Sequence, residues 1–110
     1  MPFRVYYLDD EESLCNIFSE FINSKDVHVT TFVDPSEAIN ICKKNPPDLF
    51  FIDYRLPGTT GDIVASDIDE NIPKILVTGD ISIHSTYDFQ QILSKPLDFN
   101  NIQKLIDSYL

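Results

Sequence analysis

The chain has 110 residues, 43% of them hydrophobic, with 18 acidic and 8 basic side chains and a formal net charge of −10. This length suits one domain with an ordinary core, so we expect a single domain over residues 1–110. The negative charge disfavours direct binding to nucleic acid or to anionic membranes, and no apolar run is long enough to span a bilayer.

The cysteine content and the N-terminal sequence both favour a cytoplasmic protein. Cys15 and Cys42 lie inside helical patterns without metal-ligand spacing, which is typical of buried or half-buried thiols in a reducing compartment. An apolar run that predicts a strand begins at Phe3, which leaves no room for a signal peptide. We therefore expect the protein to be cytoplasmic and not inserted in a membrane.

Strand and helix patterns alternate five times along the chain. The predicted strands are 3–8, 27–32, 48–53, 74–78 and 91–94. The predicted helices are 11–24, a helix from Asp34 that ends before Pro46, a short helix from Asp62 to about Ile68, and a last helix after Asp98. This alternation predicts right-handed crossovers and a three-layer α/β sandwich with a five-stranded parallel sheet.

Several side chains are expected to start these helices or to bury one face of them. Asp10, Asp34 and Asp98 each precede a helical pattern and are predicted N-caps. Two apolar stripes should face the sheet: Leu14, Ile17, Phe18, Phe21 and Ile22 in the first helix, and Phe99, Ile102, Leu105, Ile106 and Tyr109 in the last.

Polar residues directly follow four of the predicted strands. They are the pair Asp9-Asp10, then Asp53, Thr78 and Lys95. Residues just past the carboxyl ends of parallel strands line one crevice, so we expect three carboxylates, one hydroxyl and one ammonium to meet there. Such a set suits a divalent cation together with a phosphoryl group.

Each of these residues also has a purely structural interpretation. Asp10 could be only a helix cap, Thr78 a β-branched residue that ends a strand, and Lys95 a surface charge. Asp53 resists such an explanation, because a buried carboxylate without a partner is costly.

In this combination and order, the motifs resemble the receiver domain of two-component response regulators, from Val5 to the C-terminus. The matching pieces are Asp9-Asp10, Asp53 within Phe51-Ile52-Asp53-Tyr54-Arg55-Leu56-Pro57-Gly58, Thr78, and Lys95-Pro96. The resemblance implies the flavodoxin-like strand order 2-1-3-4-5.

The resemblance also implies a role for each residue of the crevice. Asp53 would be the phosphoacceptor and a Mg²⁺ ligand, Asp10 a direct ligand, and Asp9 a ligand directly or through water. The backbone carbonyl of Arg55 would complete the protein ligands. Lys95 would pair with the phosphoryl group, and Thr78 would donate its hydroxyl to it. Mg²⁺ would relieve the repulsion among these carboxylates, since two of them about 4 Å apart repel by about 4 kcal/mol at an effective dielectric near 20.

The expected function is therefore that of a phosphoacceptor in a phosphorelay, which takes its phosphoryl group from a histidine kinase or a phosphotransfer protein. It would signal through protein contacts and turn over no separate substrate. The alternative is an interaction module of the same fold that phosphorylation does not regulate. A phosphatase with an aspartyl nucleophile is disfavoured, because the first strand lacks its Asp-x-Asp motif. An FMN binder is disfavoured because Asp9-Asp10-Glu11-Glu12 would repel the FMN phosphate.

Two features depart from the usual receiver pattern. Ile92 occupies a position on the fifth strand where receivers usually have Tyr or Phe. The connection between Thr78 and the fifth strand is also shorter than usual by about one helical turn or more. Residues 80–89 contain no Ala or Leu and many weak helix formers, so we expect a shortened or irregular fourth helix.

Overall fold

The computed structural model describes residues 2–80, 83 and 85–110. Strands and helices alternate over most of this chain, and a two-stranded hairpin follows the third strand. In chain order the elements are β1 (Phe3–Leu8), α1 (Glu12–Ile22), β2 (Val27–Phe32), α2 (Pro35–Lys44), β3 (Leu49–Asp53), β4 (Arg55–Leu56), β5 (Thr59–Thr60), α3 (Gly61–Ser66), β6 (Lys74–Thr78), β7 (Gln91–Ser94) and α4 (Phe99–Asp107).

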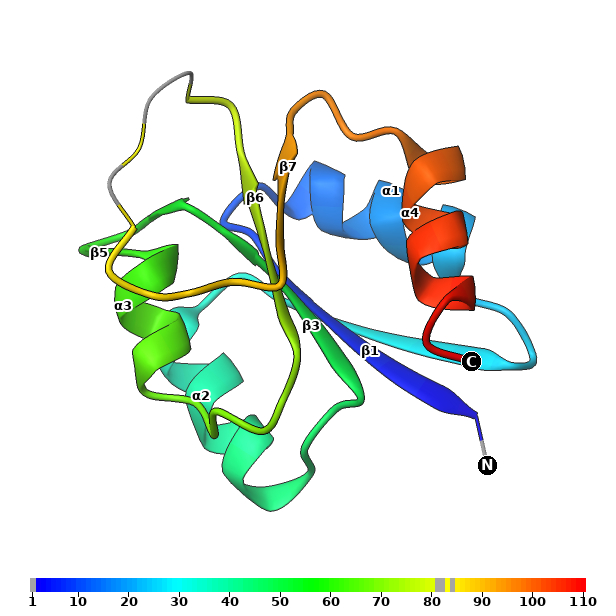
Figure 1. Ribbon diagram of the computed structural model, residues 1–110, viewed down its shortest axis with the longest axis horizontal. Coiled ribbons are helices and arrows are strands. Elements are labelled where there is room, and N and C mark those ends of the chain that lie inside the picture. The colour runs from blue at the N-terminus through cyan, green and yellow to red at the C-terminus, as the bar shows by residue number, and fades with distance from the viewer. Residues whose placement is uncertain (1, 81–82, 84) are drawn as a thin grey trace.

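Five parallel strands form one sheet in the order β2-β1-β3-β6-β7 (Figure 1). Because β4 and β5 pair only with each other, β6 and β7 are the fourth and fifth strands of this sheet, and the predicted order 2-1-3-4-5 is confirmed. The register pairs Leu8 with both Phe32 and Ile52, and Thr78 with Ser94. The strands therefore end side by side, which brings the residues that follow them to one edge of the sheet.

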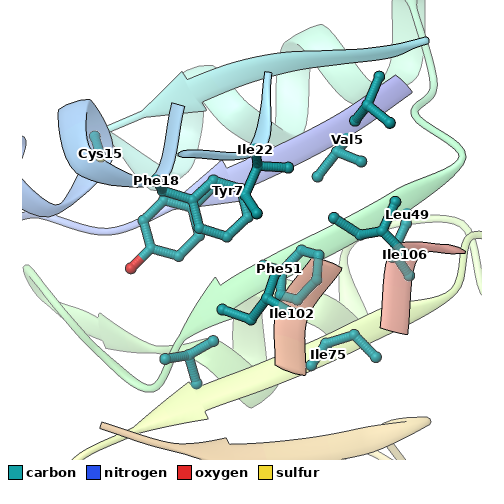
Figure 2. Close-up of a cluster of buried hydrophobic side chains, with 12 residues drawn as sticks. Val5, Tyr7, Cys15, Phe18, Ile22, Leu49, Phe51, Ile75, Ile102 and Ile106 are labelled. Carbon is teal, nitrogen blue, oxygen red and sulfur yellow. The ribbon is translucent and has the colours of Figure 1, made fainter. Parts of the chain in front are cut away.

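Each face of the sheet has its own apolar core, because successive strand residues point to opposite faces. On one face, Tyr7 and Phe51 pack with Phe18 of α1 and Ile102 of α4 (Figure 2). The other face packs against α2 and α3, and its buried residues include Tyr6, Phe50, Ile52 and Val64. Figure 1 shows the two pairs of helices on opposite sides of the sheet, which confirms the three-layer architecture.

Two of the three predicted helix caps are confirmed and one is wrong. The Asp34 carboxylate accepts a hydrogen bond from the backbone amide of Ser36, and Asp98 accepts from the amides of Asn100 and Asn101. Asp10 does not cap α1, which begins at Glu12 with Glu11 as its N-cap residue and without a side-chain cap. The carboxylate of the preceding residue, Asp9, accepts the hydrogen bond from the Glu11 amide instead. The exposed Asp10 side chain therefore does not serve as a cap.

The apolar stripe of α1 is only partly buried, contrary to the sequence prediction. Phe18 and Ile22 are buried, whereas Ile17 is 39% and Phe21 is 64% exposed. The helix rests on the sheet through the narrower row Cys15, Phe18 and Ile22, and Phe21 instead stacks on Phe99 of α4, with ring centroids 4.9 Å apart. In α4, likewise, Ile102 and Ile106 are buried and Phe99 and Leu105 half-buried. Tyr109, predicted to belong to the same helix, lies past its end and is 37% exposed.

The connection between β6 and β7 contains no helix among its described residues, 79–80, 83 and 85–90. This agrees with the expected irregular segment, although residues 81, 82 and 84 of that prediction lie outside the described residues. Polar contacts attach the described residues of this segment to the body of the protein near both of its ends, at Asp80 and Gln90, and at two places between them. The Asp62 carboxylate accepts bonds from the amide and hydroxyl of Thr86, both at 3.0 Å, and the Lys74 ammonium donates to the Tyr87 hydroxyl at 2.8 Å.

Both contacts involve a buried charged side chain that the sequence analysis did not single out. Lys74 is fully buried, and its Nζ also donates to the backbone carbonyls of Asp69 and Ile72. Burial raises the pKa of Asp62, but bonds from Thr60 and Thr86 outweigh it and lower the pKa overall. Ile92, next to this segment on β7, is 51% exposed. In the described part of the chain, no helix is long and apolar enough to cross a membrane.

Candidate functional site

The carboxyl ends of β1, β3, β6 and β7 surround one open cleft of about 400 Å³. Every side chain singled out from the sequence lies in it or directly beside it. Its lining is Asp10, Glu11, Asp53, Arg55, Thr78, Gly79, Asp80 and Lys95, with Asp9 buried at its base.

Three carboxylates converge in this cleft. Asp9, Asp10 and Asp53 each offer an oxygen within 4.8 Å of the others. Asp9 is fully buried and Asp53 only 5% exposed, whereas Asp10 is exposed. The third strand delivers Asp53 as its last residue, and the turn after β1 delivers the other two. The cluster thus combines two buried carboxylates with one that is exposed to solvent.

A single ammonium group lies between the two buried carboxylates. Lys95 Nζ is 3.1 Å from Asp9 Oδ2 and 3.2 Å from Asp53 Oδ1. Partial burial lowers the pKa of Lys95, but its bonds to Asp9 and Asp53 more than offset this, and the pKa is raised overall. The lysine is therefore charged at neutral pH. Its ammonium links the end of β7 to the ends of β1 and β3, because it contacts Asp9 and Asp53.

The charge balance of the cleft remains negative. The pKa of Asp53 is raised to about 6, first by burial and then by the negative charge of Asp9, while Lys95 offsets these effects only in part. One cation for three carboxylates is too few to stabilise all of them as anions. The site therefore favours an additional positive charge.

The Asp9 carboxylate is already fully bonded within the protein. Its Oδ1 accepts from the Glu11 amide at 2.9 Å, and its Oδ2 accepts from Lys95 and from the hydroxyl of Tyr7, the latter at 2.7 Å. Tyr7 is fully buried. Burial, followed by its bond to Asp9, raises the pKa of Tyr7, so the hydroxyl is protonated and donates.

Thr78 and Arg55 both contact Asp80, another residue that lines the cleft. The Thr78 hydroxyl oxygen accepts a bond from the Asp80 amide at 3.0 Å. Arg55 Nε is 2.9 Å from Asp80 Oδ2, and the arginine side chain is 76% exposed. The arginine charge is thus paired on the rim of the cleft.

The sequence model of the family described as "Response regulator receiver domain" matches residues 5–107 of this chain. The chain belongs to the response regulator receiver family. Receiver domains are in general signalling modules rather than enzymes, and they bind Mg²⁺ at an acidic pocket. In this receiver, the acidic cluster Asp9, Asp10 and Asp53 lies at the cleft beside the carboxyl ends of the strands.

Individual relatives agree with this assignment. The chain is 24% identical to sporulation initiation phosphotransferase F of Bacillus subtilis, covering 97% of this chain and 93% of the relative. It is 28% identical to the polar-differentiation response regulator DivK of Brucella anthropi, covering 100% and 98%. Other relatives are longer, and the chain spans only 15% to 45% of their length.

One solved structure with the same fold is a complex with a metal. It is the response regulator TrrA of Thermotoga maritima in complex with Mg²⁺-BeF, which superimposes with a TM-score of 0.86 at 22% identity and full coverage of both chains. In the present receiver, the donors that meet in the cleft are carboxylate oxygens, which Mg²⁺ prefers. The residues present therefore fit Mg²⁺.

The sequence analysis did not identify Asp80, which lines the cleft, or two further residues of the site. Tyr7 and Asp9 are two apart on β1, so strand alternation already places them on one face, and this signal could have revealed their contact. Gly61 is the other. A Cβ atom added there would collide with the backbone oxygen of Asp53, so only glycine lets α3 approach the end of β3.

Proposed function

We propose that this receiver accepts a phosphoryl group on Asp53 with the help of Mg²⁺. One observation carries the proposal: the Asp53 carboxylate opens into the cleft with Lys95 3.2 Å away and two further carboxylates within metal-binding reach. Asp9 also contacts Lys95, but it is fully buried, and only Asp53 of the two lines the open cleft. The donor would be a histidine kinase or a histidine phosphotransfer protein.

The protein ligands of Mg²⁺ would be Asp10, Asp53 and the backbone carbonyl of Arg55, with Asp9 binding directly or through water. Bound there, Mg²⁺ supplies positive charge that neutralises the carboxylates and the incoming phosphoryl oxygens. The saturated hydrogen bonding of Asp9 favours a contact through water for that residue.

Lys95 and Thr78 would complete the phosphoryl site from the β7 and β6 ends. The Lys95 ammonium already contacts Asp53 and would move onto a phosphoryl oxygen once Asp53 is modified. The Thr78 hydroxyl accepts from the Asp80 amide, and its own proton is available to a phosphoryl oxygen. A shift of Thr78 toward the phosphoryl group would draw the 79–90 segment with it, which couples the chemistry to the segment that lacks a described helix.

An apolar groove beside the site offers a surface for the phosphodonor. Leu14, Ile17, Leu97 and Phe99 line a groove of about 470 Å³, which Lys95 borders. A helix that presents a phosphorylated histidine beside its own apolar side chains would fit this groove and reach Asp53. We propose that residues 1–110 act as one receiver domain in the cytoplasm, which signals through protein contacts, binds no DNA directly and turns over no separate substrate.

Intact-mass measurement after incubation with acetyl phosphate tests this function. With Mg²⁺ the protein should gain one phosphoryl group, and without Mg²⁺ it should gain little. Asp53→Asn should abolish the gain. Asp62→Asn, which changes a buried carboxylate that does not contact Lys95, is the matched control and should still be labelled. Labelling of the Asp53→Asn protein at the level of the wild type would refute the assignment.

The second candidate is an interaction module that phosphorylation does not regulate. The observations that favour it are the absence of a helix among the described residues of 79–90 and the exposed Ile92 in place of an aromatic side chain. A Mg²⁺ titration discriminates the two, since an unregulated module has no need to bind the metal.

A further inference from the structure

The hydroxyl of Tyr7 ends inside the candidate site, although the rest of its side chain belongs to the apolar core. The ring is stacked on Phe18 with centroids 4.3 Å apart and an interplanar angle of 5°. Figure 2 shows the two rings overlapping and the Tyr7 oxygen directed out of the apolar cluster. This stacking, together with complete burial, fixes where the hydroxyl points.

The oxygen of Tyr7 is the outer end of a chain of contacts that reaches the phosphoacceptor. It donates to Asp9 Oδ2 at 2.7 Å, the same Oδ2 accepts from Lys95 at 3.1 Å, and Lys95 lies 3.2 Å from Asp53. With the Glu11 amide on Oδ1, Asp9 has three donors inside the protein. Asp9 is therefore held in one orientation, toward Lys95.

We propose that Tyr7 is a positioning residue of this receiver, whose hydroxyl holds Asp9 on Lys95 and so keeps Asp9 from binding Mg²⁺ directly. In this arrangement Asp9 orients the lysine, and Asp10 and Asp53 are left as the direct carboxylate ligands. The proposal rests on the proposed function only for its effect on phosphoryl transfer. Its effect on metal binding rests on the Mg²⁺ site alone and is measured without phosphoryl transfer.

Removal of the hydroxyl should have two opposite consequences. In Tyr7→Phe, Asp9 Oδ2 loses its shortest hydrogen bond, so the carboxylate is freer to turn toward the cation and Mg²⁺ should bind more tightly. Lys95 at the same time loses a fixed partner, so transfer at saturating Mg²⁺ should slow. Each change should amount to about three- to tenfold, the range expected for one hydrogen bond.

The test measures the two properties separately on the full chain. Isothermal titration calorimetry gives the Mg²⁺ dissociation constant, and intact mass over time gives the rate of labelling by acetyl phosphate at saturating Mg²⁺. Tyr6→Phe is the matched control. Tyr6 is the adjacent buried tyrosine, but it points to the other face of the sheet, where its hydroxyl donates to the Asn45 carbonyl.

Tyr7→Phe should lower the dissociation constant and the saturated rate together, while Tyr6→Phe leaves both unchanged. A residue that only supports the fold would shift the melting temperature without this split. Unchanged or weaker Mg²⁺ binding by Tyr7→Phe, or an unchanged saturated rate, would overturn the proposal.

Phe18→Leu provides a second variant if Tyr7→Phe fails to fold, because it frees the ring but keeps the hydroxyl. It should tighten Mg²⁺ binding in the same direction, and no change would again contradict the role. If the wild-type protein takes up no phosphoryl group, the proposed function fails, but the calorimetric comparison still decides whether Tyr7 controls Asp9.

Discussion

Asp53 is held in surroundings that oppose its own negative charge. It is 5% exposed, and its pKa is raised to about 6 by burial and by the charge of Asp9. The nearest cation, Lys95, is shared with Asp9. The same properties that destabilise the carboxylate also keep water away from it, so the residue gains from any ligand that brings positive charge.

This shift predicts how the stability of the metal-free protein depends on pH. The ordinary pKa of the carboxyl is 3.8, so between about pH 4 and pH 6 the folded chain binds more protons than the unfolded chain. The contribution of Asp53 to stability is therefore greatest below pH 4 and is lost as the pH rises through 6. Asp53→Asn should be more stable than the wild type by about 1–2 kcal/mol at pH 7, with no advantage at pH 4.

Urea denaturation in EDTA at pH 4, 5.5 and 7 measures this difference. Asp26→Asn controls for the change in net charge, because Asp26 is exposed and lies at the amino end of the sheet, next to the start of β1. A stability gain of Asp53→Asn that is equal at all three pH values would show that the raised pKa is not its cause.

At the scale of elements, the described residues of 79–90 are attached to the body by polar contacts at a few separate points, which include Asp80 on Arg55 and Gln90 on Lys74. Asp62 accepts hydrogen bonds from Thr86, and Lys74 donates one to the Tyr87 hydroxyl. The Lys74 ammonium also makes a cation–π contact with the Tyr87 ring, 4.9 Å from its centroid. Tyr87 and Phe89 add apolar contacts to the α2–α3 core. A segment held at a few points opens more readily than a regular helix packed along its length.

We expect backbone amides of residues 85–90 to exchange with solvent at least about a hundredfold faster than those of β6, because local opening of this segment costs much less than global unfolding. Exchange there should slow when the site is loaded with Mg²⁺ and beryllofluoride, as Thr78 draws the segment inward. Hydrogen exchange read by mass spectrometry measures both states.

Tyr87→Phe should speed exchange in the unloaded protein further, because it removes the bond from Lys74. The matched control is Tyr54→Phe, in which the hydroxyl has no bond among the described residues. Protection of residues 85–90 equal to that of α2 before loading would contradict the expectation.

The sequence predicts those features that depend on local periodicity, and it misses those that depend on distant partners. The strands and the placement of Asp9, Asp53, Thr78 and Lys95 at one edge follow from buried apolar runs that end in polar residues. The order of the strands comes from the resemblance to receivers. The buried state of Lys74 does not, since its partner Tyr87 is brought to it by an irregular segment.

Exposure of the α1 surface is a second feature that periodicity cannot settle. Ile17 and Phe21 fit the apolar stripe as well as Phe18 does, and only the angle at which the helix rests on the sheet leaves them at the surface. Tyr7 is different, because its contact with Asp9 follows from strand alternation but competes with the simpler reading of a core aromatic residue.

At the scale of the whole molecule, we expect the fold to be sensitive to divalent cations, because three carboxylates cluster on a chain of net charge −10. A ligand that binds only the native state adds about 2.7 kcal/mol at a hundredfold excess over its dissociation constant. Millimolar Mg²⁺ should therefore raise the melting temperature by several degrees, as measured by circular dichroism.

Asp10→Ala should remove this effect of Mg²⁺ and, because it relieves repulsion, slightly raise the stability in EDTA. Asp67→Ala, at an exposed aspartate that follows α3, controls for the loss of one negative charge and should keep the Mg²⁺ response. A wild-type melting temperature indifferent to millimolar Mg²⁺ would favour the unregulated module.

The contact between Lys95 and Asp9 also has a consequence for how the molecule reaches its folded state. It joins residues 86 positions apart, from the first strand and from just after the last. Contacts of such separation form late, since the intervening chain must be ordered first. A nascent or truncated chain without β7 therefore lacks the lysine between its carboxylates. The proposed ability to accept a phosphoryl group would then belong only to chains that have completed folding, and immature molecules would not signal.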